Sequence, residues 1–368
     1  MKSNTKIIIG IVALLFFYAC EKTIEFKGDN IQPKIVVNGN LIAEKPLKIN
    51  ISKSQSLLSE EEFFETLPNA ITDLYEDNTF IETLTYTGKV DTFIKYLPYD
   101  VIKKIPFKVG NFSGKTIPKA GRTYRLEVTC DGFESVHCET KVPGPVEILK
   151  VDTVSYAYEN EFQKYRNIHI TLHFNDQENV NNYYRIESEL KRGMVRNYYE
   201  YKQGLPFSPS DTIMIRTEPG HGINSNDPIL SPQEQANDVI FGSPENRFNI
   251  FNDTYFNGKE SKISFYNFSE NQNIEMNFGN FSLQRISLIS ISKEYYNYLN
   301  TANYHFWYDK DPFSEPVPVT SNVVGGMGIF GSSSVSSFEI LFGNYPTDGK
   351  TYVTEDYNYN YGGYSPYN

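Results

Sequence analysis

The chain has 368 residues and carries 45 Asp and Glu residues against 34 Lys and Arg residues, which gives a formal net charge of −11 at pH 7. This acidic balance argues against a nucleic-acid-binding protein and against direct electrostatic attachment to anionic lipid. The length and an apolar content of 39% predict two domains, each with its own core.

The first twenty residues have the layout of an export signal. Lys2 and Lys6 form a short positive segment, residues 7–17 are apolar except for one glycine, and Ala19 stands before Cys20. The apolar run is about half of the roughly 20 residues that a membrane-spanning helix needs. A cysteine at this place resembles the lipidation site of a bacterial lipoprotein signal.

We therefore expect residues 1–19 to be removed and Cys20 to become the lipidated first residue of the mature chain. Residues 20–32 are mostly polar and are expected to form a tether. Loss of two lysines with the signal would change the net charge from −11 to about −13. Acyl chains on Cys20 would hold the protein at a membrane, because each buried CH₂ contributes about 0.8 kcal/mol. The alternative is an ordinary secreted protein in which Cys20 is unmodified.

Residues 33–143 contain short runs of alternating apolar residues, with turn residues about every ten positions. This spacing predicts an antiparallel β-sandwich, and the strand–helix alternation of a parallel sheet is missing. The run IPKAGRTYRLEV resembles a late strand of an immunoglobulin-like or carboxypeptidase-regulatory-like domain. The sequence Pro-Gly-Pro at residues 143–145 predicts the end of this domain.

A predicted hairpin, YRLEVTCDGFESVHCETKVP, contains the two remaining cysteines, Cys130 and Cys138. A turn at residues 131–133 would pair Val128 with Val136 and place the sulfurs roughly 13 Å apart along the ladder, too far for a disulfide. A turn shifted by two residues would place the cysteines opposite each other and allow a disulfide. The Asp-Gly turn signal favours the first register, so we expect two buried free thiols.

Residues 146–350 predict a second β-sandwich, with long loops. Its clearest strand is RNIHITLHF, in which four apolar residues alternate with His169, Thr171 and His173. Residues 203–262 contain scattered Pro and Gly and are expected to be rich in loops.

The strongest helix pattern of the mature chain covers residues 293–307. Ser292 is the expected N-cap, and Glu294 lies in the first turn, where an acid is favoured. Tyr295 and Leu299 lie on one face, so the helix is expected to pack on a sheet. The tail at residues 351–368 contains six Tyr residues without a period that would bury them, and we expect it to be flexible.

The segment VVGGMGIFGSSS contains Gly326, Gly328 and Gly331 in the spacing G-x-G-x-x-G, which binds a dinucleotide pyrophosphate in other proteins. That function requires a strand before the glycines and a helix that begins at them. Prolines interrupt the preceding residues, and the serine-rich residues that follow alternate like a strand. We therefore expect these glycines to serve a turn and a close approach of the backbone, and not a nucleotide.

The histidines do not have the spacing of a transition-metal site. His169 and His173 would lie about 13 Å apart on a strand, because two side chains four residues apart are together only on a helix. We expect all five histidines to be surface or packing residues.

Acidic residues offer one weak calcium candidate, the cluster of Asp309, Asp311 and Glu315, with Asp176 and Glu178 as a second pair. Neither has the spacing of an EF-hand loop, so solvated loop acids are the default expectation. No nucleophile-elbow, zinc-helix or complete phosphate-loop motif is present. The sequence therefore names no catalytic residue, no resident metal and no cofactor.

Several segments together with Cys20 carry a resemblance to a known family. They are KIVVNGNLI, NAITDLYED, GRTYRLEV, VPGPVEI, NNYYRIE, FNDTYFNGK, KEYYNYLN and DPFSEPVPVTSNVVGGMGIFG. The sequence resembles an uncharacterised group of Bacteroidota outer-membrane lipoproteins, known only as a domain of unknown function. Members are often encoded beside TonB-dependent receptors. The resemblance covers nearly the whole mature chain and implies an outer-membrane location and a receptor barrel as partner.

We expect a membrane-anchored, non-catalytic accessory module of a TonB-dependent receptor that captures a nutrient or polymer. Loops and faces of a rigid β-sandwich suit this role, with a glycan or a peptide as ligand and without nucleic acid as a partner. Two alternatives stay open: a structural or adhesion protein of the envelope, and an enzyme with a site built from scattered residues. The face of the outer membrane on which the protein lies is also open.

Overall fold

The computed structural model describes residues 32–55, 65–95, 105–159, 164–178, 180–195, 212–219, 223–230, 245–271, 281–308, 315, 317–343 and 351–355. Cys20, His221, Asp309, Asp311 and the end of the tail lie outside these ranges. Apart from Gln32, the described residues belong to one compact unit. No helix within these ranges is long and apolar enough to cross a membrane.

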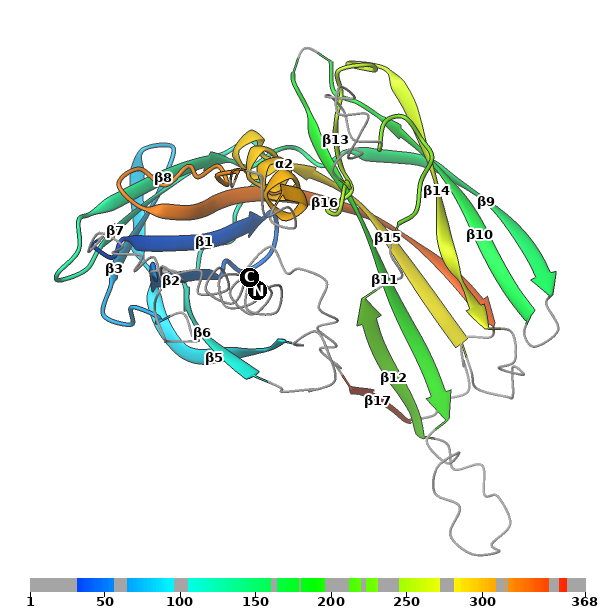
Figure 1. Cartoon of the computed structure of the whole chain (residues 1–368), viewed down its shortest axis with the longest axis horizontal. Helices are drawn as coiled ribbons and strands as arrows, with labels where there is room; N and C mark the ends of the chain where they lie inside the picture. The colour runs from blue at the N-terminus through cyan, green and yellow to red at the C-terminus, as the bar shows by residue number, and fades with distance from the viewer. Residues whose placement is uncertain are drawn as a thin grey trace, which may run out of the picture. The chain divides into compact units, whose positions relative to one another are not determined.

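The described chain is mainly β, with several antiparallel sheets and one helix, so the predicted fold class is confirmed (Figure 1). The strands of the first half are β1 (Ile35–Ile42), β2 (Ile49–Lys53), β3 (Ile71–Glu76), β4 (Thr79–Thr83), β5 (Thr85–Lys95), β6 (Ile105–Ser113), β7 (Thr123–Thr129) and β8 (Val136–Lys141). The elements of the second half are β9 (Glu147–Glu159), β10 (Lys164–Asn175), β11 (Tyr183–Val195), β12 (Thr212–Pro219), β13 (Ile250–Asn252), β14 (Glu260–Asn271), β15 (Phe281–Ile291), α2 (Lys293–Tyr308), β16 (Met327–Gly343) and β17 (Thr351–Glu355).

These strands form three sheets. The largest has the order β17-β12-β11-β15-β16-β1-β2-β6-β5, with β13 paired to β11 beside this path. A three-stranded sheet has the order β14-β10-β9, and a four-stranded sheet has the order β4-β3-β7-β8. Strands β12, β13 and the start of β14 lie within the region that was expected to be rich in loops, so that expectation was too broad.

The two halves of the chain meet in the large sheet, where β1 pairs in parallel with β16. The register runs from Val36 opposite Met327 to Ile42 opposite Ser333. The rest of β16 pairs antiparallel with β15, so one long strand joins elements from both ends of the chain. The first core accordingly includes Val323 and Phe330 besides residues of the first half.

Alternate serines of β16 bind the connection between the two halves through their side chains. The hydroxyls donate to backbone carbonyl oxygens at 2.9, 2.6 and 2.6 Å, in the pairs Ser332 with Lys141, Ser334 with Pro143, and Ser336 with Val146. The predicted boundary at residues 143–145 therefore lies along β16 and is fixed to it by hydrogen bonds. The core of the first half ends at Val142, and the core of the second begins at Val146.

The glycines of the G-x-G-x-x-G segment serve close backbone contacts, as expected. Gly328 has φ of +100° and lies so near β1 that a Cβ atom would stand 2.1 Å from the carbonyl oxygen of Val37. Gly331 faces α2, where a Cβ would stand 2.7 Å from Cβ of Tyr295. The residues after the glycines form β16 and not a helix. No helix begins at these glycines, as a pyrophosphate site of this kind requires.

The hairpin β7–β8 has the first of the two registers considered for it. Val128 is opposite Val136, and Leu126 is opposite Cys138. Cys138 is buried and Cys130 is only partly buried, and both are free thiols. The expectation of free thiols is confirmed, whereas the expectation that both are fully buried is wrong for Cys130, because this residue lies at the turn. Burial raises the pKa of the Cys138 thiol well above its ordinary value.

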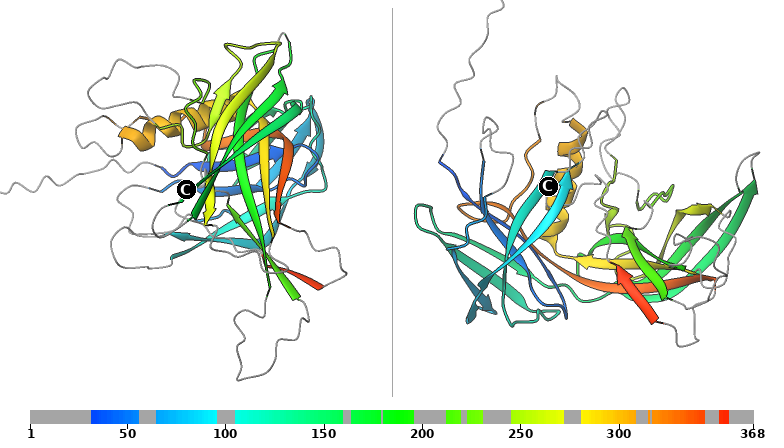
Figure 2. Two further views of the ribbon diagram at one scale, coloured as in Figure 1. Left: turned by 90° about the vertical axis from the view of Figure 1, so that its right-hand side faces the viewer. Right: turned by 90° about the horizontal axis from the view of Figure 1, so that it is seen from below.

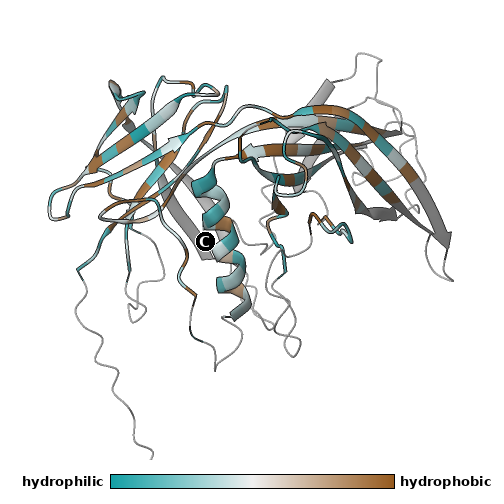
Figure 3. Cartoon of the chain, turned by 90° about the horizontal axis from the view of Figure 1, so that it is seen from above, coloured by the Kyte–Doolittle hydropathy of each residue, from teal (hydrophilic) through white to brown (hydrophobic). Residues whose placement is uncertain are grey.

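The second core lies between the three-stranded sheet and β11 and β15, with the alternation that the sequence predicts (Figure 3). In β10, Ile170, Leu172 and Phe174 are buried, whereas His169, Thr171 and His173 on the other face are not. Figure 3 shows this alternation as brown and teal bands along the strands.

The predicted helix is confirmed as α2. The Ser292 hydroxyl accepts a hydrogen bond from the backbone N–H of Tyr295 at 3.3 Å, as an N-cap does. Tyr295, Leu299 and Ala302 are buried in a third core, together with residues of β15 and β16. The helix therefore lies on one face of the large sheet (Figure 2).

Gly328→Ala tests the joint between β1 and β16. The new methyl would overlap the carbonyl of Val37, in addition to the strain of positive φ, so we expect the free energy of unfolding to fall by about 3–5 kcal/mol. Gly132→Ala is the matched control, because Gly132 has φ of +86° in open space and its substitution should cost only about 1 kcal/mol. Equal losses for the two variants in urea unfolding would show that β1 does not approach β16 this closely.

Candidate functional site

Two buried aspartates lie at one end of the second core, each at the end of the same three-residue sequence. Phe-Asn-Asp occurs at residues 174–176, at the end of β10, and again at residues 251–253, at the end of β13. The two phenylalanines are buried with ring centroids 6.2 Å apart, and Asp176 and Asp253 are only 8% and 4% exposed. We call this pair the aspartate junction.

Asp176 accepts hydrogen bonds from three residues in two different parts of the chain. Its Oδ2 accepts the backbone N–H of Gly258 at 2.7 Å, and its Oδ1 accepts the amide of Asn182 at 3.1 Å and the hydroxyl of Tyr184. Burial of Tyr184 and the hydrogen bond from its hydroxyl to Asp176 raise the pKa of Tyr184. Since buried carboxylates are costly unless they are hydrogen-bonded, these contacts compensate the burial of Asp176. They also join the loop before β14 to the start of β11.

Asp253 completes the junction from the other side of Asn182. Its Oδ2 accepts the backbone N–H of Asn182 at 2.7 Å. Burial raises the pKa of Asp253, and the nearby carboxylate of Asp176 raises it further. The junction therefore brings two carboxyl groups close together, and Asn182 donates hydrogen bonds to both. These hydrogen bonds hold the loop before β14 and the residues before β11 together.

Another carboxylate, in the first half of the chain, accepts hydrogen bonds from neighbouring backbone amides of one loop. Residues 114–116 read Gly-Lys-Thr, the end of a phosphate-loop motif, although the full motif is absent. The carboxylate of Glu82 accepts the backbone N–H groups of Lys115 at 3.0 Å and Thr116 at 2.7 Å. Burial alone would raise the pKa of Glu82, but these hydrogen bonds outweigh it and lower the pKa. The protein thus supplies its own anion to this loop.

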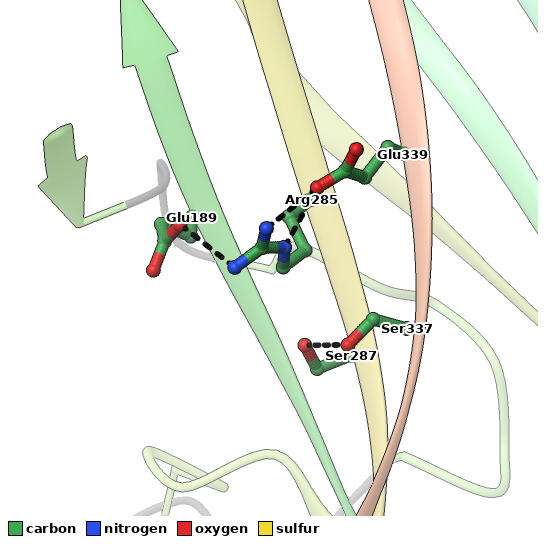
Figure 4. A network of polar contacts seen from close by, with 5 residues as sticks. All are labelled: Glu189, Arg285, Ser287, Ser337 and Glu339. Carbon is green, nitrogen blue, oxygen red and sulfur yellow. Dashed lines mark hydrogen bonds and ion pairs between the residues drawn. The ribbon is translucent and has the colours of Figure 1, made fainter. Parts of the chain in front are cut away.

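A row of charges crosses three strands of the large sheet, and Figure 4 shows it. Glu189 on β11, Arg285 on β15 and Glu339 on β16 are directly opposite one another in the register. The Arg285 guanidinium donates to Glu339 through Nε at 2.9 Å and through Nη2 at 2.6 Å, and through Nη1 to Glu189 at 3.5 Å. We call these three residues the charged ladder.

The neighbouring row of the same face is also polar. Ser287 and Ser337 share a hydrogen bond of 3.0 Å. Nearer the helix, Arg185 forms an ion pair with Glu187 at 3.0 Å and donates to the hydroxyl of Tyr295 on α2 at 3.3 Å. The ladder is partly exposed to water, and its side chains stand on rigid strands. The ladder therefore presents charges at fixed positions to water.

The structure places the remaining predicted residues apart from one another. Glu315 is exposed, and its two partners in the weak calcium cluster lie outside the described ranges. Asp176 turns into the aspartate junction, and Glu178 is exposed, so this pair does not form a calcium site. Within the described part of the chain, no three His, Cys, Asp or Glu residues are grouped to hold a metal. His169 and His173 lie on the outer face of β10.

Asp176→Ala tests the aspartate junction. The substitution leaves the N–H of Gly258, the amide of Asn182 and the hydroxyl of Tyr184 without their acceptor, so we expect unfolding free energy to fall by about 2–4 kcal/mol. Glu178→Ala, two residues away on the surface, should change it by less than about 0.5 kcal/mol. If thermal denaturation shows the same small effect for both, Asp176 does not clamp the loops.

Glu82→Gln tests the hydrogen bonds between Glu82 and the backbone of residues 114–116, through the pH dependence of stability. A lowered folded-state pKa means that the Glu82 carboxylate stabilises the protein above the ordinary carboxyl pKa, and that this stability is lost as pH falls through the folded value. We expect the variant to be less stable by about 1 kcal/mol at pH 7. Measured by urea unfolding, the difference in unfolding free energy between the parent chain and the variant should shrink below about pH 4. The exposed Glu139→Gln serves as control, and a difference that stays constant with pH would contradict the assignment.

The comparisons with known proteins find one family and no curated relative. No curated protein matches the chain. A family model matches residues 21–339, which include the charged ladder, the aspartate junction and the glycine segment of β16. The family is described as a domain of unknown function, which agrees with the resemblance to an uncharacterised family. The chain belongs to this family, DUF4249.

Proposed function

We propose that this protein is a lipid-anchored lipoprotein of the outer membrane of Bacteroidota, where it serves as a non-catalytic accessory module of a TonB-dependent receptor. In this proposal the acyl groups on Cys20 hold the protein at the membrane, and the β-sheet faces bind a partner or a nutrient polymer.

The observation that carries the proposal is the sequence from Lys2 to Cys20. Its positive start, short apolar run and final cysteine combine an export signal with a lipid attachment point. An acidic chain has little electrostatic attraction for an anionic membrane, so a lipid is the efficient way to keep it there.

The structure supports a binding role through the way it uses its charges. The carboxylates of Asp176 and Glu82 hold the protein's own loops, whereas the charged ladder faces water on three adjacent strands. Charges held in this way favour fast and specific association with a complementary surface. The proposed partner is the receptor barrel, with the ladder as the docking surface.

Mass spectrometry of the N-terminal peptide tests the anchor. We expect the full-length chain, produced in a Gram-negative host, to fractionate with membranes and to begin at an acylated Cys20. Cys20→Ser should lose the acyl mass and leave the membrane fraction, whereas Cys130→Ser should keep both. A mature chain that starts elsewhere with an unmodified Cys20 would contradict the proposal.

Pull-down of the anchored protein from native membranes tests the partner. We expect an outer-membrane receptor barrel to be recovered, with a yield that falls severalfold for the double variant Glu189→Lys and Glu339→Lys. Recovery of other envelope proteins without a barrel would favour the structural or adhesion role instead.

A further inference from the structure

The expected tether enters the folded part of the chain at one end of the large sheet. Residues 20–32 precede β1, which begins at Ile35. Strand β16 runs parallel to β1 and begins at the same end, with Met327 opposite Val36 (Figure 1). The two strands therefore both lead away from the place where the tether is attached.

The starts of β3 and β8 lie at this end as well. A Cβ atom on Gly326 would stand 2.5 Å from the carbonyl oxygen of Ile35 and 2.9 Å from Cγ1 of Val136, so β8 begins beside β1 and β16. Ile71, the first residue of β3, is opposite Thr129, the last residue of β7. We call this end of the molecule the tether end, and it consists of residues 33–36, 53–55, 65–71, 129–137 and 324–327.

Three large apolar side chains of the tether end face water. Val324 is 57% exposed, Ile71 is 56% exposed and Met327 is 49% exposed. Among the described residues around the first core, the other large apolar side chains with such exposure are Phe80 and Ile117. Phe80 follows the turn at the far end of β3, and Ile117 lies in the loop beside the far end of β1. Most of the exposed apolar side chains of this part therefore lie where the tether is attached.

The backbone holds two of these side chains in fixed positions. Val324 exchanges two backbone hydrogen bonds with His137, at 2.8 and 3.3 Å. Gly325 follows with φ of +81°, and Met327 is already paired in the parallel ladder with β1. The side chains of Val324 and Met327 consequently stay in water until another surface covers them. Covering them is favourable in proportion to the apolar area removed from water.

The charges of the tether end do not select an acidic surface as its partner. The ionisable side chains within the ranges that define it are two basic, three acidic and one histidine: Lys34, Lys53, Glu65, Asp131, Glu134 and His137. One basic and one acidic side chain, Lys53 and Glu65, form an ion pair with each other. Without an excess of basic groups there is no electrostatic attraction to anionic lipid, so contact through this end depends on apolar area.

The tether limits which surface this end meets. Thirteen residues, 20–32, span at most roughly 45 Å when extended, and acyl groups on Cys20 would keep their far end in the bilayer. Contact within this reach is intramolecular in effect, so a few apolar side chains that are too weak to bind lipid from solution suffice. The opposite end of β1 lies eight residues, or about 26 Å, further from the attachment point.

We propose that the tether end rests on the lipid bilayer, with Val324, Met327 and Ile71 at the boundary between headgroups and acyl chains. This inference rests on the proposed function, because the acyl groups on Cys20 bring the tether end to the bilayer. Strand β16 then carries the charged ladder away from the lipid, since Glu339 lies further along the same strand.

Fluorescence quenching by lipid-borne nitroxide tests this orientation. The full-length lipidated protein is reconstituted in phosphatidylcholine vesicles that contain a nitroxide-labelled lipid, and one fluorophore is attached to Val324→Cys or to Met327→Cys. Both variants also carry Cys130→Ser, which removes the partly exposed thiol. Cys138 does not react, because it is buried and burial raises the pKa of its thiol.

The matched controls are Phe80→Cys and Ile117→Cys, whose parent side chains are 52% and 46% exposed and lie away from the tether end. We expect quenching of the labels at Val324→Cys and Met327→Cys to be severalfold stronger than quenching at the controls. The ratio should be the same when phosphatidylglycerol is added, because the contact is apolar. Melting temperatures equal to that of the parent chain show that the labelled variants are folded.

Equal quenching at all four positions, stronger quenching at the controls, or quenching at the tether end that requires phosphatidylglycerol would overturn the inference. Mass spectrometry of the N-terminal peptide and flotation of the vesicles are measured on the same samples. Acylated protein that floats with the vesicles but shows no such difference leaves the anchor intact, and only the orientation fails. Protein that is neither acylated nor vesicle-bound contradicts the proposed function, and the orientation fails with it.

Discussion

The parallel pairing of β1 with β16 is the constraint on which the rest of the structure depends. It brings Val36–Ile42 beside Met327–Ser333 and so places strands from both halves of the chain in one sheet. The contact needs a residue without a side chain at Gly328, because the Val37 carbonyl occupies the space of a Cβ. The serines that follow then bind the connection between the halves through their hydroxyls. One segment thus provides a strand, a close approach and a set of side-chain hydrogen bonds.

The polar groups of the protein divide into those that hold the fold and those that face water. The carboxyl groups of Asp176 and Glu82 accept hydrogen bonds from segments distant in sequence and so hold loops in place. The charged ladder stands on strands whose other faces are packed in the second core. Side chains on such a face keep the spacing that the sheet sets.

Local features could be predicted from the sequence because neighbouring residues determine them. The alternation around His169 and His173, the helix after Ser292 and the hairpin register at Cys138 all depend on short-range periods, caps or turns. The ladder and the aspartate junction could not be predicted, because they arise when strands distant in sequence come into register. One signal was available for the junction: Phe-Asn-Asp occurs twice, at the ends of two strands. Nothing in the residues around Arg285 indicates which acids will flank it.

The position of β16 near the end of the sequence has a consequence for how the molecule is made. A ribosome releases β1 early, but its parallel neighbour follows only after roughly 290 further residues, a separation that belongs to slow-folding, non-local topologies. Until that neighbour is synthesised, β1 exposes an unpaired edge to other chains in the cell. The edge of β1 that β16 covers therefore stays unpaired until almost the whole sequence is available.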